Sequence, residues 1–349
     1  MIRVAPTLAV LLLLVACGSD TEEPTPAQLP YETLSEYGFF EGPLADQAPA
    51  DGVLAYAPVS PLWADYAEKG RYIVLPEGET IDPEGDEDWV YPLGSIIVKS
   101  FYFVEDRRDL AGPARIMETR LLIREDVEEG WTSHTYVWND EQTEAERVIA
   151  GRRISLAYTD EDGGSAEQIY LVPNTNQCRD CHGREDVTVL LGINTYQLDY
   201  EVGGANQLDV LVDAGAFSRR PERTVPALVD PAEDSNTPEL RARSYLHANC
   251  SHCHRPGGDG GRSGLDLRIW QEDPARYGVC KTPVAAGAGA GGRSYDLVPR
   301  HPELSILPFR MASTDPEVRM PELPSRVPDD FGVELIEEWI LSMDAEGCE

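Results

Sequence analysis

The chain has 349 residues, and its 62 acidic against 29 basic side chains give a formal net charge of −33 at pH 7. A surface this acidic repels nucleic acid and anionic lipid headgroups, which excludes nucleic acid as a partner, and it attracts basic protein surfaces. The same charge also serves solubility, so charge alone does not select a partner. The hydrophobic fraction of 42% is typical of a globular chain, and the length suffices for two to three domains.

The N-terminus has the features of an export signal. Arg3 precedes an apolar run over 4–16 that is too short to span a bilayer. The run ends in Leu14-Val15-Ala16-Cys17, which resembles the lipobox of bacterial lipoproteins and implies lipidation of Cys17. An ordinary signal peptide that contains a cysteine is the alternative. We expect a signal peptide over 1–17, a flexible tether over 18–39, and an exported lipoprotein, periplasmic or at the cell surface, anchored by lipid to the outer membrane.

Residues 40–172 have the pattern of a β-rich domain. Short runs of β-branched and aromatic residues alternate with turn signals, among them Glu161-Asp162-Gly163-Gly164. This pattern favours a sandwich or a small barrel. The expected strands are Ile96–Phe103, Met117–Arg124, His134–Trp138, Arg153–Tyr158 and Gln168–Val172.

From residue 173 onward the strand signals fade, and cysteines, glycines and short helical patterns replace them. A stretch rich in Pro, Arg and acidic residues over 219–235 indicates a linker between the segments 173–235 and 236–349. Thr237-Pro238-Glu239 predicts a helix start, with Thr as N-cap, Pro at the first helical position and an acid in the first turn. The expected helices cover 207–212, the stretch from Thr237 towards Cys250, and 332–343.

One cysteine motif occurs twice in the second half of the chain. Cys178-Arg179-Asp180-Cys181-His182 and Cys250-Ser251-His252-Cys253-His254 both match C-x-x-C-H, the attachment pattern of c-type haem. Cysteines three apart lie on one face of a helical turn, so both thiols can bond one porphyrin, and the following His can ligate its iron. The sequence therefore predicts two covalently bound haem c groups, on Cys178 and Cys181 with His182, and on Cys250 and Cys253 with His254.

Zinc and thiol redox chemistry are the rival interpretations of this motif. Two Cys-x-x-Cys pairs can close a Cys₄ zinc site, but ribbon-type sites place the pairs about 15 to 20 residues apart, and the gap here is far longer. A thioredoxin-like pair needs no following His and would not occur twice. The glycine-rich stretch 257–264 after the second motif is expected to let the backbone pass close to the haem edge.

Each iron needs a further ligand or an open position. For the second haem we expect Met320, because a Met thioether opposite His gives a stable low-spin iron that suits an electron carrier; the alternative is a Met that fills a core gap. The first haem leaves several choices open. They are Met311, His247, His134, His301, His252 or no ligand at all.

Two cysteines remain outside the motifs. Cys280 and Cys348 are expected to form a disulfide, because a free thiol rarely persists in an exported domain. A free thiol or a third site is the alternative.

With these motifs in place, a family resemblance emerges. Residues 237–348 resemble the class I cytochrome c fold, and nearly the whole mature chain resembles a family of proteobacterial dihaem c-type cytochrome lipoproteins of the conserved hypothetical type. The resemblance implies haem binding and electron transfer and supplies no substrate. The landmarks are 118–122, 136–139, 249–254, 278–281, 310–316, Met320-Pro321-Glu322 and Trp339-Ile340.

Together these features predict an α+β multidomain protein. We expect an N-terminal all-β, sandwich-like domain over 40–172, followed by mostly α-helical, cytochrome c-like haem domains over 173–235 and 236–349. The expected function is electron transfer between redox partners. We expect these partners to dock on the acidic chain through basic surfaces of their own. The alternatives are a peroxidase- or oxidase-like dihaem enzyme with an open first haem, and a surface interaction module with auxiliary haems.

Overall fold

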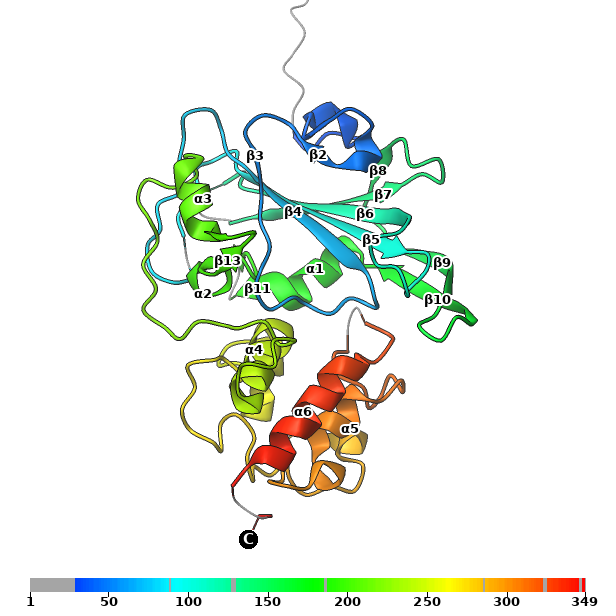
Figure 1. Ribbon diagram of the computed structural model, residues 1–349, viewed down its shortest axis with the longest axis vertical. Helices are drawn as coiled ribbons and strands as arrows, with labels where there is room; N and C mark the ends of the chain where they lie inside the picture. Colours follow the sequence, from blue (N-terminus) through cyan, green and yellow to red (C-terminus); the bar gives the residue numbers. More distant parts are fainter. Residues whose placement is uncertain are drawn as a thin grey trace, which may run out of the picture.

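A six-stranded antiparallel sheet forms the centre of the N-terminal half (Figure 1). The computed structural model describes residues 29–87, 89–126, 130–184, 187–284, 286–322, 325–344 and 347–348; the signal peptide with Cys17 and the first half of the tether, 18–28, lie outside these residues. The six strands are neighbours in chain order, so the sheet is a meander. They are β3 (Val53–Ala55), β4 (Glu68–Val74), β5 (Ile96–Val104), β6 (Ala114–Ile123), β7 (Thr132–Trp138) and β8 (Ala145–Val148).

The sheet is covered on both faces, which explains why its strands are rich in apolar residues. One face packs under the N-terminal stretch that carries β1 (Phe40–Glu41) and β2 (Ala48–Pro49), around buried Leu34 and Tyr136. The other face packs against a later segment, where Ile73 and Ile97 of the sheet meet Leu208 and Leu211. Strands with both faces buried lose the strict alternation of apolar and polar residues.

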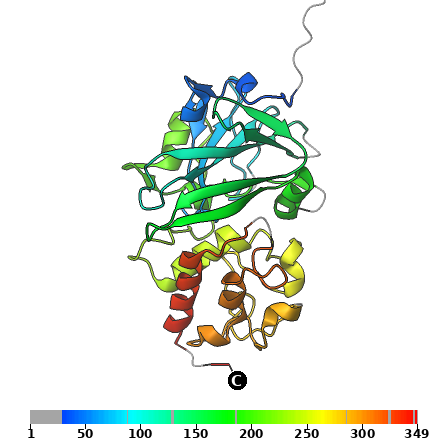
Figure 2. The ribbon, with the colours of Figure 1, turned by 90° about the vertical axis from the view of Figure 1, so that its right-hand side faces the viewer.

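A separate hairpin stands beside the end of the sheet (Figure 2). Its strands are β9 (Arg152–Thr159) and β10 (Ser165–Val172), and the predicted Glu161–Gly164 turn joins them. Phe101 and Met117 of the sheet pack against Tyr170 and Val172 of the hairpin. All five strands expected from the sequence are present, within a few residues of their expected ends.

The segment 173–235 does not form a helical domain of its own. It contributes three short helices and two two-stranded hairpins, and Leu198, Leu208 and Phe217 are buried in the same core as the sheet. The helices are α1 (Thr175–His182), α2 (Thr195–Leu198) and α3 (Gln207–Asp213). The hairpins are β11 (Gly183–Arg184) with β12 (Val187–Thr188) and β13 (Glu201–Val202) with β14 (Ala205–Asn206).

The C-terminal part lies below the sheet in Figures 1 and 2 and is built on three helices. They are α4 (Pro238–Cys250), α5 (Ile306–Met311) and α6 (Asp330–Ser342). As predicted, Thr237 caps α4 by accepting a hydrogen bond from the Leu240 amide at 3.3 Å. Leu246 of α4 packs with Ile336 and Trp339 of α6 in one core. Loops and short 3₁₀ turns make up most of the rest.

The expected fold class is therefore wrong. Among the residues that the structure describes, helices account for 22% and strands for 26%, in six helices and several small sheets, so the second half is not a set of mostly α-helical haem domains. The N-terminal half is one meander with a hairpin, not a sandwich of two comparable sheets. The physical reason is shared burial: α2 and α3 of the 173–235 segment pack on the sheet and share its core, since each is too short to be stable alone.

Two further features are a disulfide and the length of the helices. Cys280 and Cys348 form a disulfide, with their Cα atoms 5.4 Å apart, and it ties the loop before α5 to the segment after α6. Within the described ranges, the structure has no helix with the length and apolarity to cross a bilayer.

Candidate functional site

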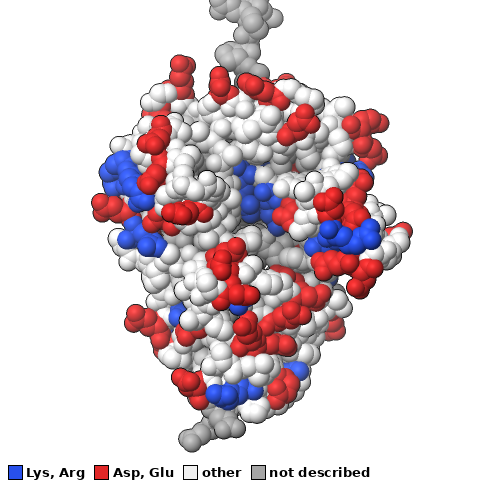
Figure 3. All heavy atoms as spheres, viewed as in Figure 1, with Lys and Arg blue, Asp and Glu red and all other residues white. Residues whose placement is uncertain are grey.

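A cavity of about 660 Å³ opens between the sheet half and the C-terminal half, within the size range of ligand pockets. Figure 3 shows the molecule hollowed near its middle, between the two halves. Both C-x-x-C-H motifs line this cavity, although 72 positions separate Cys178 from Cys250 in the chain. The structure thus brings together residues that the sequence could place only in two separate motifs. The shared lining set is Cys178, Cys181, His182, Cys250, Cys253, His254, Met311 and Met320.

The first motif is presented by helix α1. Asn174 caps this helix: its side chain accepts the Gln177 amide, and the Gln177 side chain accepts the Asn174 amide, each at 3.0 Å. The cap anchors a helix of only eight residues. Cys178 and Cys181 lie three positions apart on it, so both thiols share one face. Burial raises the pKa of Cys178.

His182 is held so that one specific ring nitrogen stays free. Its Nδ1 lies 2.8 Å from the Val189 carbonyl oxygen, which can only accept, so Nδ1 carries the proton and donates. Nε2 is then the nitrogen with the lone pair. Burial lowers the pKa of His182 to about 4, so the ring is neutral at neutral pH. A neutral ring with Nδ1–H bonded to a carbonyl is the arrangement in which histidine ligates a metal.

The second motif begins at the last residue of helix α4. Cys250 ends the helix, and a turn follows in which the His254 amide donates to the Cys250 carbonyl at 2.8 Å. This turn keeps Cys250 and Cys253 close in the manner of a helical turn. Burial raises the pKa of Cys250 to about 12, so this thiol stays protonated.

His254 shows the same nitrogen assignment as His182. Its Nδ1 lies 3.0 Å from the Ser263 hydroxyl oxygen, and that hydroxyl donates its hydrogen to the Gly260 carbonyl at 2.6 Å. The Ser263 oxygen must therefore accept from Nδ1–H, which leaves the lone pair on Nε2. Burial lowers the pKa of His254 to about 4. A Cβ on Gly260 would lie 2.9 Å from Nδ1, so the glycine-rich loop packs directly on the imidazole.

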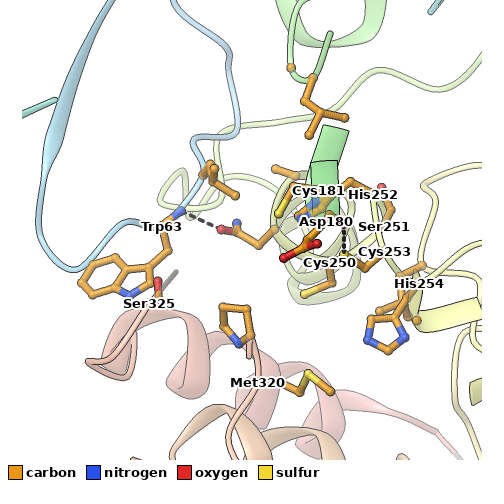
Figure 4. A pocket seen from close by; sticks show the side chains of 18 of the residues that line it. Trp63, Asp180, Cys181, Cys250, Ser251, His252, Cys253, His254, Met320 and Ser325 are labelled. Carbon is orange, nitrogen blue, oxygen red and sulfur yellow. Dashed lines mark hydrogen bonds between the residues drawn. The ribbon is translucent and has the colours of Figure 1, made fainter. Parts of the chain in front are cut away.

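The two motifs meet at one thiol from each. The ligand atoms of Cys181, Cys253 and His252 all lie within 4.8 Å of one another. Figure 4 shows the three side chains together, with Asp180 beside them and its backbone carbonyl accepting from the Cys253 thiol at 3.8 Å. The neighbouring Cys253 thiol lowers the pKa of Cys181, and the neighbouring Cys181 raises the pKa of Cys253.

Three of the residues considered as further iron ligands differ in their position relative to the cavity. Met320 lines the cavity and lies across from the Cys250–Cys253 turn in Figure 4. Met311 also lines the cavity but is buried in the core between α4 and α6. His301 does not line it: the side chain is 38% exposed and pairs with Glu303 at 3.0 Å.

Two further histidines on the cavity wall are already bonded. The His247 ring accepts the Ile269 amide at 2.9 Å through Nδ1, and burial lowers its pKa to about 3. His134 lies 3.1 Å from the Thr132 hydroxyl through Nε2, and burial lowers its pKa. Each ring therefore keeps its other nitrogen for a second partner.

A loop of the sheet half positions the second motif and the Met320 loop, and the sequence carried no signal for it. The Trp63 amide donates to the Asn249 side chain at 2.7 Å, next to Cys250 (Figure 4). The buried Asp65 carboxylate accepts the Arg326 and Val327 amides at 2.9 and 3.1 Å. Desolvation by burial raises the pKa of Asp65 despite these bonds. Because these contacts span more than 180 residues, only the folded chain reveals them.

The charge of the cavity is opposite to that of the molecule. Its wall carries ten Lys and Arg side chains and seven Asp and Glu side chains, whereas the chain has 29 and 62. In Figure 3 acidic side chains spread over the outer surface, while Lys and Arg atoms lie inside the hollow. Such a lining favours a ligand with negatively charged groups.

Comparison with models of protein families, with curated proteins and with solved structures finds no match to this chain. The chemistry of the site therefore rests on its own geometry.

Proposed function

We propose that this protein is a dihaem c-type cytochrome that transfers electrons between redox partners. The observation that carries the proposal is the shared state of the two motif histidines. In both His182 and His254, Nδ1–H is bonded to a fixed oxygen and Nε2 keeps its lone pair. Two unrelated loops produce this same arrangement, each directly after a Cys-x-x-Cys pair.

The residues of the cavity fit the group that the motifs imply. Cys178 and Cys181 would hold one haem and Cys250 and Cys253 the other, and all four thiols are free of disulfides. The apolar and aromatic part of the wall suits a porphyrin ring, and the surplus of cations suits its carboxylates. When bound, haem supplies a one-electron redox centre whose potential depends on axial ligands and burial.

The contact between the motifs explains why two centres would share one cavity. Cys181 and Cys253 lie side by side, so the two attachment positions adjoin. Adjacent centres allow an electron to pass within the protein, which suits a relay better than two independent carriers. The acidic outer surface would attract redox partners with basic docking surfaces.

We also propose that the chain is exported and held by lipid on Cys17, at the periplasmic face or the cell surface, with the outer membrane as its anchor. The support is the short apolar run that ends at Cys17. The Cys280–Cys348 disulfide agrees with an oxidising compartment.

A pyridine haemochrome assay with intact mass, on the full chain co-expressed with a cytochrome maturation system, tests the proposal. The wild type should carry two covalent haems. The double variants Cys178→Ser/Cys181→Ser and Cys250→Ser/Cys253→Ser should each lose one, and Cys348→Ser, the matched control, should keep both. A colourless product with the mass of polypeptide and lipid alone would refute the haem assignment.

A second candidate is a redox enzyme whose first iron keeps an open position. Both methionines on the cavity wall, Met311 and Met320, belong to the C-terminal half, and Met311 is packed into its core. This leaves a histidine or no ligand for an iron held by His182. A high-spin ferric signal that shifts on addition of cyanide would favour the enzyme, whereas two low-spin spectra would favour the carrier.

A third candidate is a metal-ion site, which the Cys181, His252 and Cys253 cluster favours. Thiolate and imidazole ligands suit zinc. Haem attachment would consume both thiols, so the two assignments exclude each other. Metal and haem analysis of the purified chain and of His252→Ala decides between them. A metal site would lose its ion in that variant, whereas a dihaem protein would keep both haems.

A further inference from the structure

A row of three cations crosses the face of the sheet that looks into the cavity. In the ladder Arg71 of β4 is directly opposite Lys99 of β5, and Lys99 is directly opposite Arg120 of β6. All three side chains line the cavity. Directly opposed like charges destabilise a sheet, and here they stand side by side in three neighbouring strands.

Only one member of the row is neutralised by the protein. Arg120 forms a two-pronged ion pair with the buried Glu118 carboxylate, at 2.8 and 2.5 Å. Among the residues that the structure describes, neither Arg71 nor Lys99 has an acidic partner within ion-pair distance, and Lys99 makes only a contact with the Phe101 ring, at 5.0 Å. Burial, followed by the charge of Arg71, lowers the pKa of Lys99 well below its ordinary value.

The row lies in a setting where unpaired charge is unfavourable. On the same face of the sheet, Ile73 and Ile97 belong to one hydrophobic cluster and Phe101 to another, so the cations occupy a polar band between two apolar regions. Arg71 and Lys99 are half-buried, and a cation that is partly removed from water without a counter-charge loses hydration without compensation. A fold that retains two such cations on a cavity wall is best explained by a ligand that brings the negative charge.

We propose that Arg71 and Lys99, with Arg120 beside them, form a binding site for a carboxylate or oxyanion group in the cavity. Arg supplies a planar fork of donors and Lys a point charge, the usual combination for such groups. The anion can come from two sources. One is a free oxyanion, whose binding does not depend on the proposed function; the other is a propionate of a haem on the first motif, and this source rests on the proposed function.

The experiment uses the full chain as purified, coloured or not, and titrates it with inorganic phosphate while unfolding temperature and binding heat are measured. The variants are Lys99→Gln and Arg71→Gln, and the matched control is Arg152→Gln, an exposed cation of β9. If the site takes a free oxyanion, phosphate binds saturably to the wild type and the control, and about tenfold or more weakly to either variant.

If a haem propionate occupies the site, phosphate does not bind. The midpoint potential of one haem then falls in Lys99→Gln and Arg71→Gln relative to Arg152→Gln, because removal of a nearby cation favours the oxidised iron. The proposal is overturned if phosphate does not bind and both variants keep the wild-type potentials, or if a colourless chain fails to bind phosphate. The haemochrome assay reports separately on the proposed function, so the two failures are distinguishable.

Discussion

Replacement of Gly260 by Ala tests whether the glycine-rich loop must touch the imidazole of the second motif. An added Cβ would lie 2.9 Å from Nδ1 and 3.0 Å from Cε1 of His254, and 3.2 Å from the Cys253 carbonyl oxygen. Non-bonded carbon atoms prefer about 3.5 Å or more, so the ring or the loop must move by about half an ångström. Gly260 has no positive φ, so the backbone itself tolerates Ala.

The expected loss of stability in Gly260→Ala follows from the contacts that resist this movement. The ring cannot turn away without stretching the 3.0 Å hydrogen bond from Nδ1 to Ser263, and the loop cannot retreat without loosening the Ser263 bond to Gly260. Overpacking a well-filled site destabilises by about 1 to 3 kcal/mol, and we expect about 2 kcal/mol here. In a chain of 349 residues that loss corresponds to a fall in melting temperature of about 3 °C.

The assay has two readouts, thermal unfolding and the visible absorption that reports iron ligation. Gly112→Ala is the matched control, because its Cβ would lie 3.0 Å from the Asp109 carbonyl oxygen in a loop remote from the cavity. Both variants should lose stability, but only Gly260→Ala should also shift the absorption. The reasoning fails if Gly260→Ala melts within 1 °C of the wild type with an unchanged spectrum.

Three further predictions concern stability. His247→Phe should have a lower free energy of unfolding than the wild type at pH 7. A lowered His pKa contributes stability above pH 6.5 that is lost as pH falls, so in denaturant titrations the difference between the two proteins should narrow by about 2 kcal/mol or more between pH 6.5 and 4.5. A constant difference would contradict the pKa of about 3. Gly332→Ala should destabilise by about 1 to 3 kcal/mol, since its Cβ would overlap the Tyr245 ring; the loss should shrink in a Tyr245→Ala background, and an equal loss there would disprove the contact. Cys348→Ser should lower the free energy of unfolding by about 4 kcal/mol, because the lost disulfide closes a loop with a sequence separation of 68. In urea titrations a reductant should then have no further effect on the variant.

The elements that the sequence predicted well are those with a strong local pattern. The strands β5, β6, β7, β9 and β10 are runs of β-branched and aromatic residues, and α4 begins at a complete capping signal. Strand β4 was missed because its first half, Glu68-Lys69-Gly70-Arg71, is charged and contains glycine. Of these four residues Arg71 lines the cavity wall instead of a core, which only the folded chain reveals.

The sequence by itself determined the four motif cysteines, the two histidines that follow them and the pair left for a disulfide, because these depend on residue type and spacing within a few positions. Tertiary structure alone decided that both motifs share one cavity and that Cys181 meets Cys253. It also decided that the segment around α3 completes the core of the sheet, which overturned the expected helical domain. Such contacts join residues far apart in the chain, and their free energy depends on burial that no local pattern encodes.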